Sequence, residues 1–280
     1  MELARAAAAH SNENGELGNT LACIFRDFEV TRESAAGFKA NLRQIHVDIP
    51  RTWAGNPWFA DAQADGCVKL ERVLMAYVIK HRATYIQSMN FVSAIVLAFN
   101  GGDEAEALCI SAAIFESVPY YRDFDLLRRD TELLALELRA RDPALARHLQ
   151  HACHFDLLHV TPSWLLCCFF LAVAPDNAAL VVSAVLKHRA DARGLLLAIA
   201  LDGMIMRRAD LLRACDLEDV FPIMRALDRY GFSAEPSAVL SNAQLDARWV
   251  MLKSLAGPSS SAADENSPAN RRRVSYPFAL

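Results

Sequence analysis

The order of apolar and polar residues along the chain predicts a series of helices. The clearest one has the three-and-four spacing of an amphipathic helix, with apolar residues at Leu70, Val73, Leu74, Tyr77 and Val78. Similar patterns, or apolar runs with polar breaks at their ends, predict further helices over residues 91–99, 107–118, 130–142, 144–155, 178–190, 194–206, 217–231 and 242–255. The sequence shows neither alternating short strands nor a repeat of fixed period. The pattern therefore predicts an all-α fold with many short-to-medium helices.

Glycine, proline and acidic residues mark where the predicted helices begin and end. Asn100, Gly101 and Gly102 end one helix, and the acidic residues that follow suit the positive N-terminal end of the next. Pro143 opens another helix, and Pro222 either kinks the helix around it or starts a new one.

The two ends of the chain differ from its centre in composition. Residues 1–20 mix helix-forming alanines with Asn and Gly, so we expect a poorly ordered N-terminal segment. Residues 256–280 are rich in Ser, Pro and Arg and lack the apolar surface that offsets chain entropy, so we expect a disordered tail. Residues 21–255 are predicted to form a single multi-helix domain.

One apolar run, from Trp164 to Ala174, raises the question of a membrane segment. It ends at Pro175 after about three helical turns, whereas a membrane span needs roughly 20 apolar residues. With 53% hydrophobic and 22% charged residues, the whole chain has the composition of a globular protein with a substantial core. We therefore predict a fully buried helix at this run and no insertion into a membrane.

Charge and cysteine content narrow the classes of function. The formal net charge of −4 gives no electrostatic support for a nucleic-acid partner. The seven cysteines have no regular spacing, many of them lie in apolar runs, and no signal peptide is visible. These features predict a reduced, cytoplasmic protein.

Two polar stretches interrupt the apolar pattern and are the best candidates for a functional site. In QIHVDIPRT, Ile45, Asp48 and Arg51 are three residues apart, so a helical turn places them on one face. Pro50 stiffens the exit from that turn, and Asp48 is near enough in sequence to hold the Arg51 guanidinium. In YIQSMNF, Gln87 lies between two apolar segments. This position indicates either a polar connection between helices or a side chain presented to a partner.

The two stretches resemble the paired motifs of the TBC domain family, the activators of Rab-type small GTPases. IHVDIPRT is similar to the family's I-x-x-D-x-x-R motif, and YIQSMNF is similar to its Y-x-Q motif. Three further stretches agree: the helix before Y-x-Q, an acidic-start helix ending in Pro and aromatic residues, and the region around Trp164. The resemblance covers about residues 38–229, with the motifs in the family's order.

The resemblance implies a TBC-like fold and a GTPase-activating protein of vesicle trafficking. Arg51 would be an arginine finger and Gln87 a glutamine finger, both supplied to the nucleotide site of a Rab-family small GTPase. Ile45, Asp48 and Tyr85 would form the supporting shell that fixes the two loops. GTP and Mg²⁺ would be carried by the partner, since the chain has no glycine-rich phosphate loop and no cofactor of its own is implied. The chain would be a GTPase activator rather than an enzyme in its own right, recruited at most peripherally to endomembranes through the GTPase.

The sequence departs from the family pattern in several places, which leaves a second hypothesis open. No R-G-x-x-W-like element precedes the arginine motif, Trp53 is followed by Ala54 where a proline is common, and no R-x-W-D stretch occurs later. Ser88 also stands where glycine is common. The alternative is a catalytically impaired TBC-like scaffold that binds a GTPase or a trafficking protein.

Three other groups of residues have chemistry of their own. Possible zinc ligands cluster along one predicted helix, at His148, His151, Cys153 and His154. Paired CxxC and HExxH motifs are absent, so outward-facing polar histidines are the preferred interpretation and no metal site is predicted. Cys167 and Cys168 are adjacent in an apolar run, which favours core packing over redox chemistry. Ser275 follows three arginines and is either a candidate phosphorylation site or part of a solvated charge cluster.

Overall fold

The computed structural model describes residues 35–229, 231–236 and 238–256. Its longer helices are α3 (Ala35–Asp48), α4 (Asp65–His81), α5 (Met89–Phe99), α6 (Glu104–Ser117), α7 (Phe124–Arg141), α10 (Pro175–Lys187), α11 (Ala192–Met206), α13 (Leu217–Met224) and α14 (Asn242–Ala256). Shorter helical turns lie between them: η2 (Ile49–Arg51), η3 (Pro57–Phe59), η4 (Pro119–Tyr121), α8 (Pro143–Arg147), η5 (His148–Ala152), η6 (Leu157–His159), α9 (Thr161–Leu165), η7 (Arg189–Asp191) and α12 (Arg208–Leu211). This part of the chain contains no strand, only an isolated bridge between Arg229 and Gly231, so the predicted all-α class is confirmed.

Several expectations drawn from composition fall outside the described residues. They are the poorly ordered segment 1–20, the start of the domain near residue 21, and the tail 256–280 with its candidate phosphorylation site at Ser275, apart from Ala256, which is the last residue of α14.

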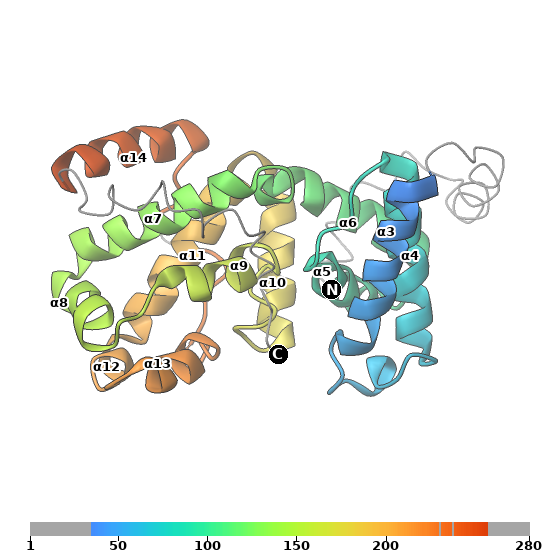
Figure 1. The fold of residues 1–280 in the computed structure, drawn as a ribbon, viewed down its shortest axis with the longest axis horizontal. Helices are drawn as coiled ribbons and strands as arrows, with labels where there is room; N and C mark the ends of the chain where they lie inside the picture. Colours follow the sequence, from blue (N-terminus) through green and yellow to red (C-terminus); the bar gives the residue numbers. More distant parts are fainter. Residues whose placement is uncertain (1–34, 230, 237, 257–280) are drawn as a thin grey trace.

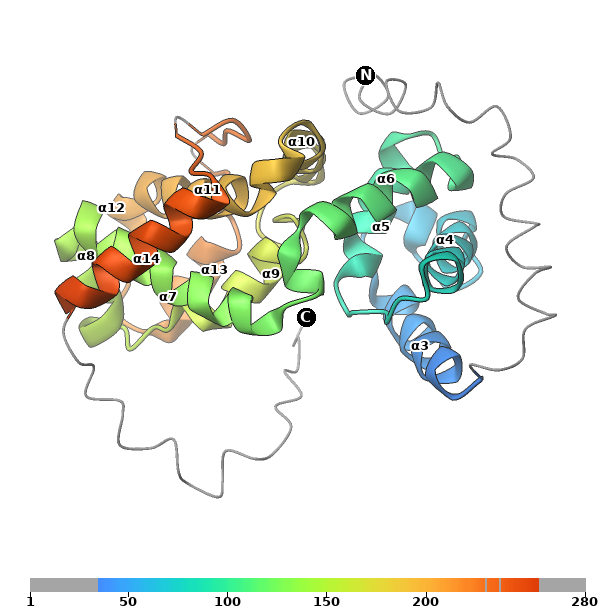
Figure 2. The same ribbon diagram turned by 90° about the horizontal axis from the view of Figure 1, so that it is seen from above.

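Figures 1 and 2 show two groups of helices side by side. In the first group, α4 packs against α3, α5 and α6. In the second group, α7 packs against α8, α11 and α14. The yellow α10 joins the two groups, because it contacts α5 and α6 in one and α11 in the other (Figure 2). Both polar stretches singled out in the sequence belong to the first group.

Aspartates cap the N-terminal ends of several helices, among them α6, α7 and α8. Asp103 accepts a hydrogen bond from the Glu106 amide at 2.9 Å, and Asp142 accepts one from the Leu145 amide at 3.0 Å. Asp123 caps α7 in the same way, at 3.0 Å. Each cap satisfies an amide that has no partner within its helix. The helix start predicted from the acidic residues after Gly102 is therefore confirmed at α6.

The apolar run from Trp164 to Ala174 is almost entirely buried, as predicted, but it is not one helix. α9 ends at Leu165, and both Cys168 and Phe169 have positive φ angles, 46° and 64°, which a right-handed helix does not allow. Aromatic packing accounts for the break, because Phe169 folds back to stack on Trp164 with ring centroids 5.9 Å apart. The next residue, Phe170, packs against the rings of Trp53 and Phe91, and Phe91 belongs to α5 in the first helix group. The helix prediction was wrong beyond Leu165.

Two more predicted helices are shorter than the sequence pattern indicated. Within the helix predicted over residues 144–155, the α-helical part, α8, ends at Arg147. The π-helical turn η5 follows directly and ends at Ala152. The helix predicted over 217–231 stops at Met224, so Pro222 lies in its last turn and starts no new helix. Among the described residues, no helix combines the length and the apolar character needed to cross a membrane.

Candidate functional site

The arginine stretch begins where α3 ends. After Asp48 the chain enters the 3₁₀ turn η2, with Pro50 in its first turn, and the Thr52 amide closes the turn on the Ile49 carbonyl at 2.9 Å. Arg51, at the end of this turn, has a side chain that is 42% exposed and forms an ion pair with Asp48. The structure thus places the Arg51 guanidinium at the surface, with its inner side against a carboxylate.

The Asp48 carboxylate is buried and has three different donors. Its side chain is only 2% exposed. Besides Arg51, the Gln44 amide nitrogen lies 3.2 and 3.1 Å from its two oxygens, and the Tyr85 hydroxyl donates to Oδ2 at 2.9 Å. Burial, and next the nearby Asp48 charge, raise the pKa of Tyr85, so the phenol keeps its proton and remains a donor. A buried carboxylate needs this degree of hydrogen bonding to remain charged.

A second set of hydrogen bonds ties the arginine stretch to the glutamine stretch. Thr52 Oγ1 donates to the Asp48 carbonyl at 2.8 Å and accepts from Asn90 Nδ2 at 2.7 Å. Asn90 Oδ1 accepts from the Ser88 amide at 3.1 Å and lies 3.1 Å from the Tyr85 hydroxyl. Two segments far apart in sequence are therefore connected through buried polar side chains, which hold them in one relative position.

Gln87 lies in the loop between α4 and α5. It is half-buried, and among the described residues its carboxamide has no hydrogen-bond partner. Tyr85, two residues earlier, is held by Asp48, and Ser88 immediately after has a φ angle of +118°. The loop backbone around Gln87 is thus fixed by its neighbours, while no hydrogen bond within the described residues engages the Gln87 side chain.

The structure brings together three of the five residues singled out in the sequence, since Asp48 directly contacts both Arg51 and Tyr85. Ile45 lies in the last turn of α3 and is buried at 1% exposure. Gln87 joins this group through its loop rather than through a side-chain contact.

Four further polar residues around the site were not identified from the sequence, namely Asn41, Gln44, Thr52 and Asn90. Asn41 and Gln44 precede Asp48 by seven and four positions, which is the spacing of one helix face, and this spacing was the signal available in the sequence. The hydrogen-bond partners of Asn41 are backbone atoms of Ala83 and Tyr85, in the loop between α4 and α5. No sequence pattern indicates such contacts with the backbone.

The histidine and cysteine cluster at residues 148–154 does not form the helix face that the sequence pattern indicated. His148 Nε2 lies 2.8 Å from the Ala214 carbonyl and 3.5 Å from Cys153 Sγ. Within the described ranges, no group of three or more His, Cys, Asp or Glu side chains is placed to hold a metal ion.

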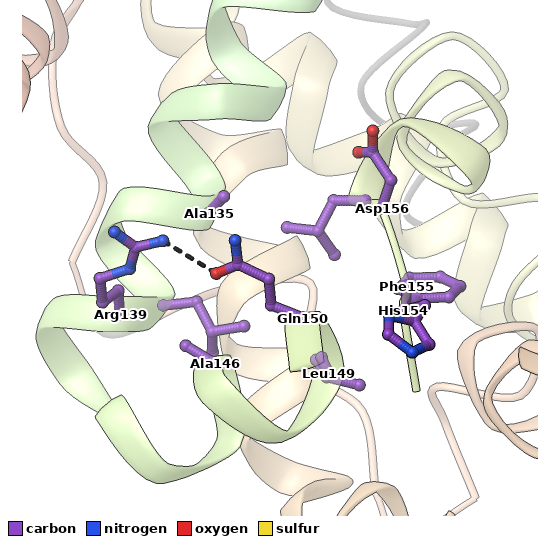
Figure 3. Close-up of a pocket in the computed structure, with 10 residues that line it drawn as sticks. Ala135, Arg139, Ala146, Leu149, Gln150, His154, Phe155 and Asp156 are labelled. Carbon is purple, nitrogen blue, oxygen red and sulfur yellow. Dashed lines mark hydrogen bonds between the residues drawn. The ribbon is translucent and has the colours of Figure 1, made fainter. Parts of the chain in front are cut away.

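His154 lines a surface cleft of about 400 Å³ at the far end of α7, where Arg139 donates to Gln150 Oε1 at 3.1 Å (Figure 3). The cleft floor is apolar, and buried Phe155 and Leu157 contribute to it. In Figure 1 this end of α7 lies on the opposite side of the molecule from α3.

Cys167 and Cys168 are buried, and burial raises the pKa of both thiols, to about 12 for Cys168. Both therefore stay protonated and unreactive near neutral pH, which fits the core packing predicted for them.

Comparison with known proteins agrees with the motifs and the fold. The family model of the Rab-GTPase-TBC domain matches residues 21–211. TBC1 domain family member 2A from Homo sapiens is 32% identical over 132 residues, covering 45% of this chain and 14% of that protein. The Bos taurus protein of the same name is 31% identical over 131 residues, again covering 45% and 14%. This chain therefore matches only about one seventh of the length of these relatives.

Two solved structures share the fold. A flagellar RabGAP TBC domain from Chlamydomonas superposes with a TM-score of 0.62 at 22% identity, covering 92% of this chain and 78% of the other. The Ypt/Rab-GAP domain of Gyp1p superposes with a TM-score of 0.61 at 14% identity, covering 89% and 79%. At these identities the likeness concerns the fold alone.

Proposed function

Because the chain belongs to the Rab-GTPase-TBC domain family, we propose that it accelerates GTP hydrolysis by a Rab-type small GTPase, using Arg51 and Gln87. GTP and Mg²⁺ belong to the GTPase, and this chain supplies side chains to that nucleotide site. On this proposal the chain acts in the cytoplasm and reaches endomembranes through the GTPase it binds.

The chemistry of the reaction explains the choice of an arginine. During phosphoryl transfer, negative charge spreads over the oxygens of the transferred group, and an arginine supplied in trans raises the rate by about 10³–10⁵-fold. This corresponds to roughly 4–7 kcal/mol of transition-state stabilisation. Arginine keeps its charge and offers a planar fork of donors, which lysine does not. Arg51 has the exposure and the position at a stiff turn that this role requires.

A glutamine suits the second role, which is to orient the attacking water. Its carboxamide offers an acceptor and two donors on one planar group. The Gln87 carboxamide has no partner among the described residues, so it is available for this task.

The observation that carries the proposal is the buried Asp48 carboxylate, which binds Arg51 on one loop and Tyr85 on the other. Two side chains that act on one nucleotide must be held in a fixed relation, because misplacement by about 1 Å can reduce a rate by about 10²-fold. A network that spans both loops serves this purpose, whereas two unrelated surface loops would have no need of it.

The test is single-turnover GTP hydrolysis by a panel of Rab-type GTPases, with the parent chain and variants. On a responsive GTPase, Arg51→Ala should lower the activated rate by about 10³-fold or more. Arg51→Lys should lose most of the activation as well, because a point charge does not replace the forked contact. Gln87→Ala should lower the rate by about 10²-fold.

Arg139→Ala and Gln150→Ala are matched controls for these variants, since both residues are exposed and lie at the other end of the molecule (Figures 1 and 3). Both controls should keep the parent rate. If Arg51→Ala activates a responsive GTPase as well as the parent does, the arginine assignment is wrong. If the parent binds a GTPase without accelerating hydrolysis, the chain is a scaffold instead.

A further inference from the structure

The Asn41 side chain joins α3 to the loop that carries Gln87. Its Nδ2 donates to the Ala83 carbonyl at 3.2 Å, and its Oδ1 accepts from the Tyr85 amide at 2.9 Å. Both ends of one carboxamide are therefore used, on two backbone groups of the same short segment. The asparagine pairs with the loop as a neighbouring strand would, although no strand is present in this described part of the chain.

The loop needs such a partner because it lies between helices. Arg82 ends α4 in the left-handed conformation, and α5 starts only at Met89. Backbone groups in such a segment have no helical partner and must find another. Asparagine is a weak helix former, so Asn41 in the middle of α3 does not favour the helix itself. It contributes to the fold through its hydrogen bonds with the loop.

The position of Asn41 on α3 links this contact to the arginine. Asn41 precedes Asp48 by seven residues, or close to two helical turns, so the two residues lie on the same face of α3. Asp48 fixes Arg51, and Asn41 fixes the backbone that leads to Gln87. One rigid helix thus sets the distance between the two loops.

We infer that Asn41 is a positioning residue, which acts on GTP hydrolysis through Gln87 by holding residues 83–85 against α3. This inference rests on the proposed function. Asn41 touches neither nucleotide nor GTPase in this role, and it lies outside both sequence motifs. Without its carboxamide, the loop loses its direct hydrogen bonds to α3 and keeps those that Ala83, Tyr85, Ile86 and Ser88 make elsewhere.

The kinetic test separates positioning from binding and from folding. Asn41→Ala should lower the single-turnover rate at saturating activator by about tenfold or more. The concentration of activator that gives half the maximal rate should change less than about twofold, because Asn41 is not a contact for the GTPase. Asn41→Asp should recover part of the loss, since it keeps the acceptor for the Tyr85 amide. In a Gln87→Ala background, Asn41→Ala should cause no further loss.

Asn177→Ala is the matched control. Asn177 Nδ2 donates to Asp228 Oδ2 at 2.9 Å in a half-buried position on α10, so this variant also removes an asparagine hydrogen bond. It should keep the parent rate. Equal losses in Asn41→Ala and Asn177→Ala would overturn the inference, and so would a full loss from Asn41→Ala in the Gln87→Ala background.

Native-state hydrogen exchange tests the contact without any GTPase. In Asn41→Ala the Tyr85 amide should exchange about fivefold faster or more, since its hydrogen bond is lost. If no GTPase responds to the parent chain, the proposed function fails, whereas this measurement still decides whether Asn41 holds the loop. Unchanged exchange at Tyr85 would overturn the inference even if the chain proves to be an activator.

Discussion

Ser88 has the largest positive φ angle, +118°, of the described residues other than glycine. A side chain in this region is strained by roughly 1–2 kcal/mol, because its Cβ crowds the following carbonyl. The strain lies directly beside Gln87, at a position where TBC sequences commonly have glycine. Local strain of this kind persists only where neighbouring contacts enforce it, and here the Asn90 side chain holds the Ser88 amide.

Ser88→Gly should therefore stabilise the protein by about 1 kcal/mol, after allowing for the greater freedom of glycine in the unfolded chain. The measurement is urea denaturation followed by circular dichroism. Ser88→Ala is the matched variant, because it removes the hydroxyl and keeps the Cβ. If alanine stabilises as much as glycine does, the hydroxyl is responsible and the backbone explanation is wrong.

At the level of single residues, the sequence revealed contacts between near neighbours better than contacts across the fold. The spacing of Asp48 and Arg51 predicted their ion pair, and the structure contains it. The family resemblance placed Asp48 and Tyr85 in one supporting shell, but no spacing in the sequence indicates the hydrogen bond between them, because they lie 37 positions apart. The bonds of Asn41 to loop backbone could not be predicted, because every residue offers the same backbone groups.

At the level of elements, helices with a sequence signal at their ends were predicted well. The helix predicted over residues 91–99 is α5, which ends at Phe99 before Asn100 and two glycines, and the helix predicted over residues 242–255 is α14. The run after Trp164 is apolar at nearly every position, so no pattern showed that its helix ends at Leu165. The π-helical turn of η5 depends on tertiary packing and has no signature in the sequence.

The cap of α8 should depend on pH. The hydrogen bond from the Leu145 amide lowers the pKa of Asp142 below 3.8; burial opposes this shift, and the Arg208 partner adds to it. A carboxyl whose pKa is lower in the folded state stabilises the protein above the pKa of the unfolded state. This stabilisation is lost as pH falls through the folded-state pKa.

Asp142→Ala should lower stability by about 1 kcal/mol near neutral pH, because it removes the cap acceptor. Asp142→Asn keeps a cap acceptor and removes only the charge. The difference in unfolding free energy between the parent and Asp142→Asn should be constant near pH 7 and shrink below about pH 4. Denaturation curves over this range measure it. A difference that stays constant down to pH 2 would mean that the Asp142 charge does not contribute.

At the scale of the whole molecule, the segment that leads to α14 packs directly on α11. A Cβ on Gly194 would lie 1.9 Å from the Leu240 carbonyl oxygen, so only glycine allows this approach. The neighbouring Arg193 forms a buried ion pair with Asp130 on α7 and a second one with Asp246 on α14. Three helices are joined at this point, although the matched family model ends at residue 211.

Gly194→Ala should therefore destabilise the protein by about 1–3 kcal/mol, because backbone rather than a flexible side chain must move. Gly203→Ala on the same helix is the matched control. The nearest neighbours of its Cβ would be atoms of the Leu227 side chain, the closest at 3.3 Å, and alanine favours the helix by up to about 1 kcal/mol. Thermal unfolding of both variants tests the difference in stability. Equal melting temperatures for the two variants would show that the backbone at Leu240 moves aside at little cost in free energy.

The Asp48 carboxylate also bears on the encounter between this protein and its proposed partner. Before the encounter, the Arg51 guanidinium is already neutralised by an anion, and afterwards it would face phosphate oxygens instead. The Asp48 carboxylate would still accept hydrogen bonds from Gln44 and Tyr85, which would offset part of the cost of losing its counter-ion in the interior. Release of Arg51 would therefore be favourable only where phosphate oxygens replace the carboxylate, and the guanidinium would stay paired with Asp48 whenever no nucleotide is near.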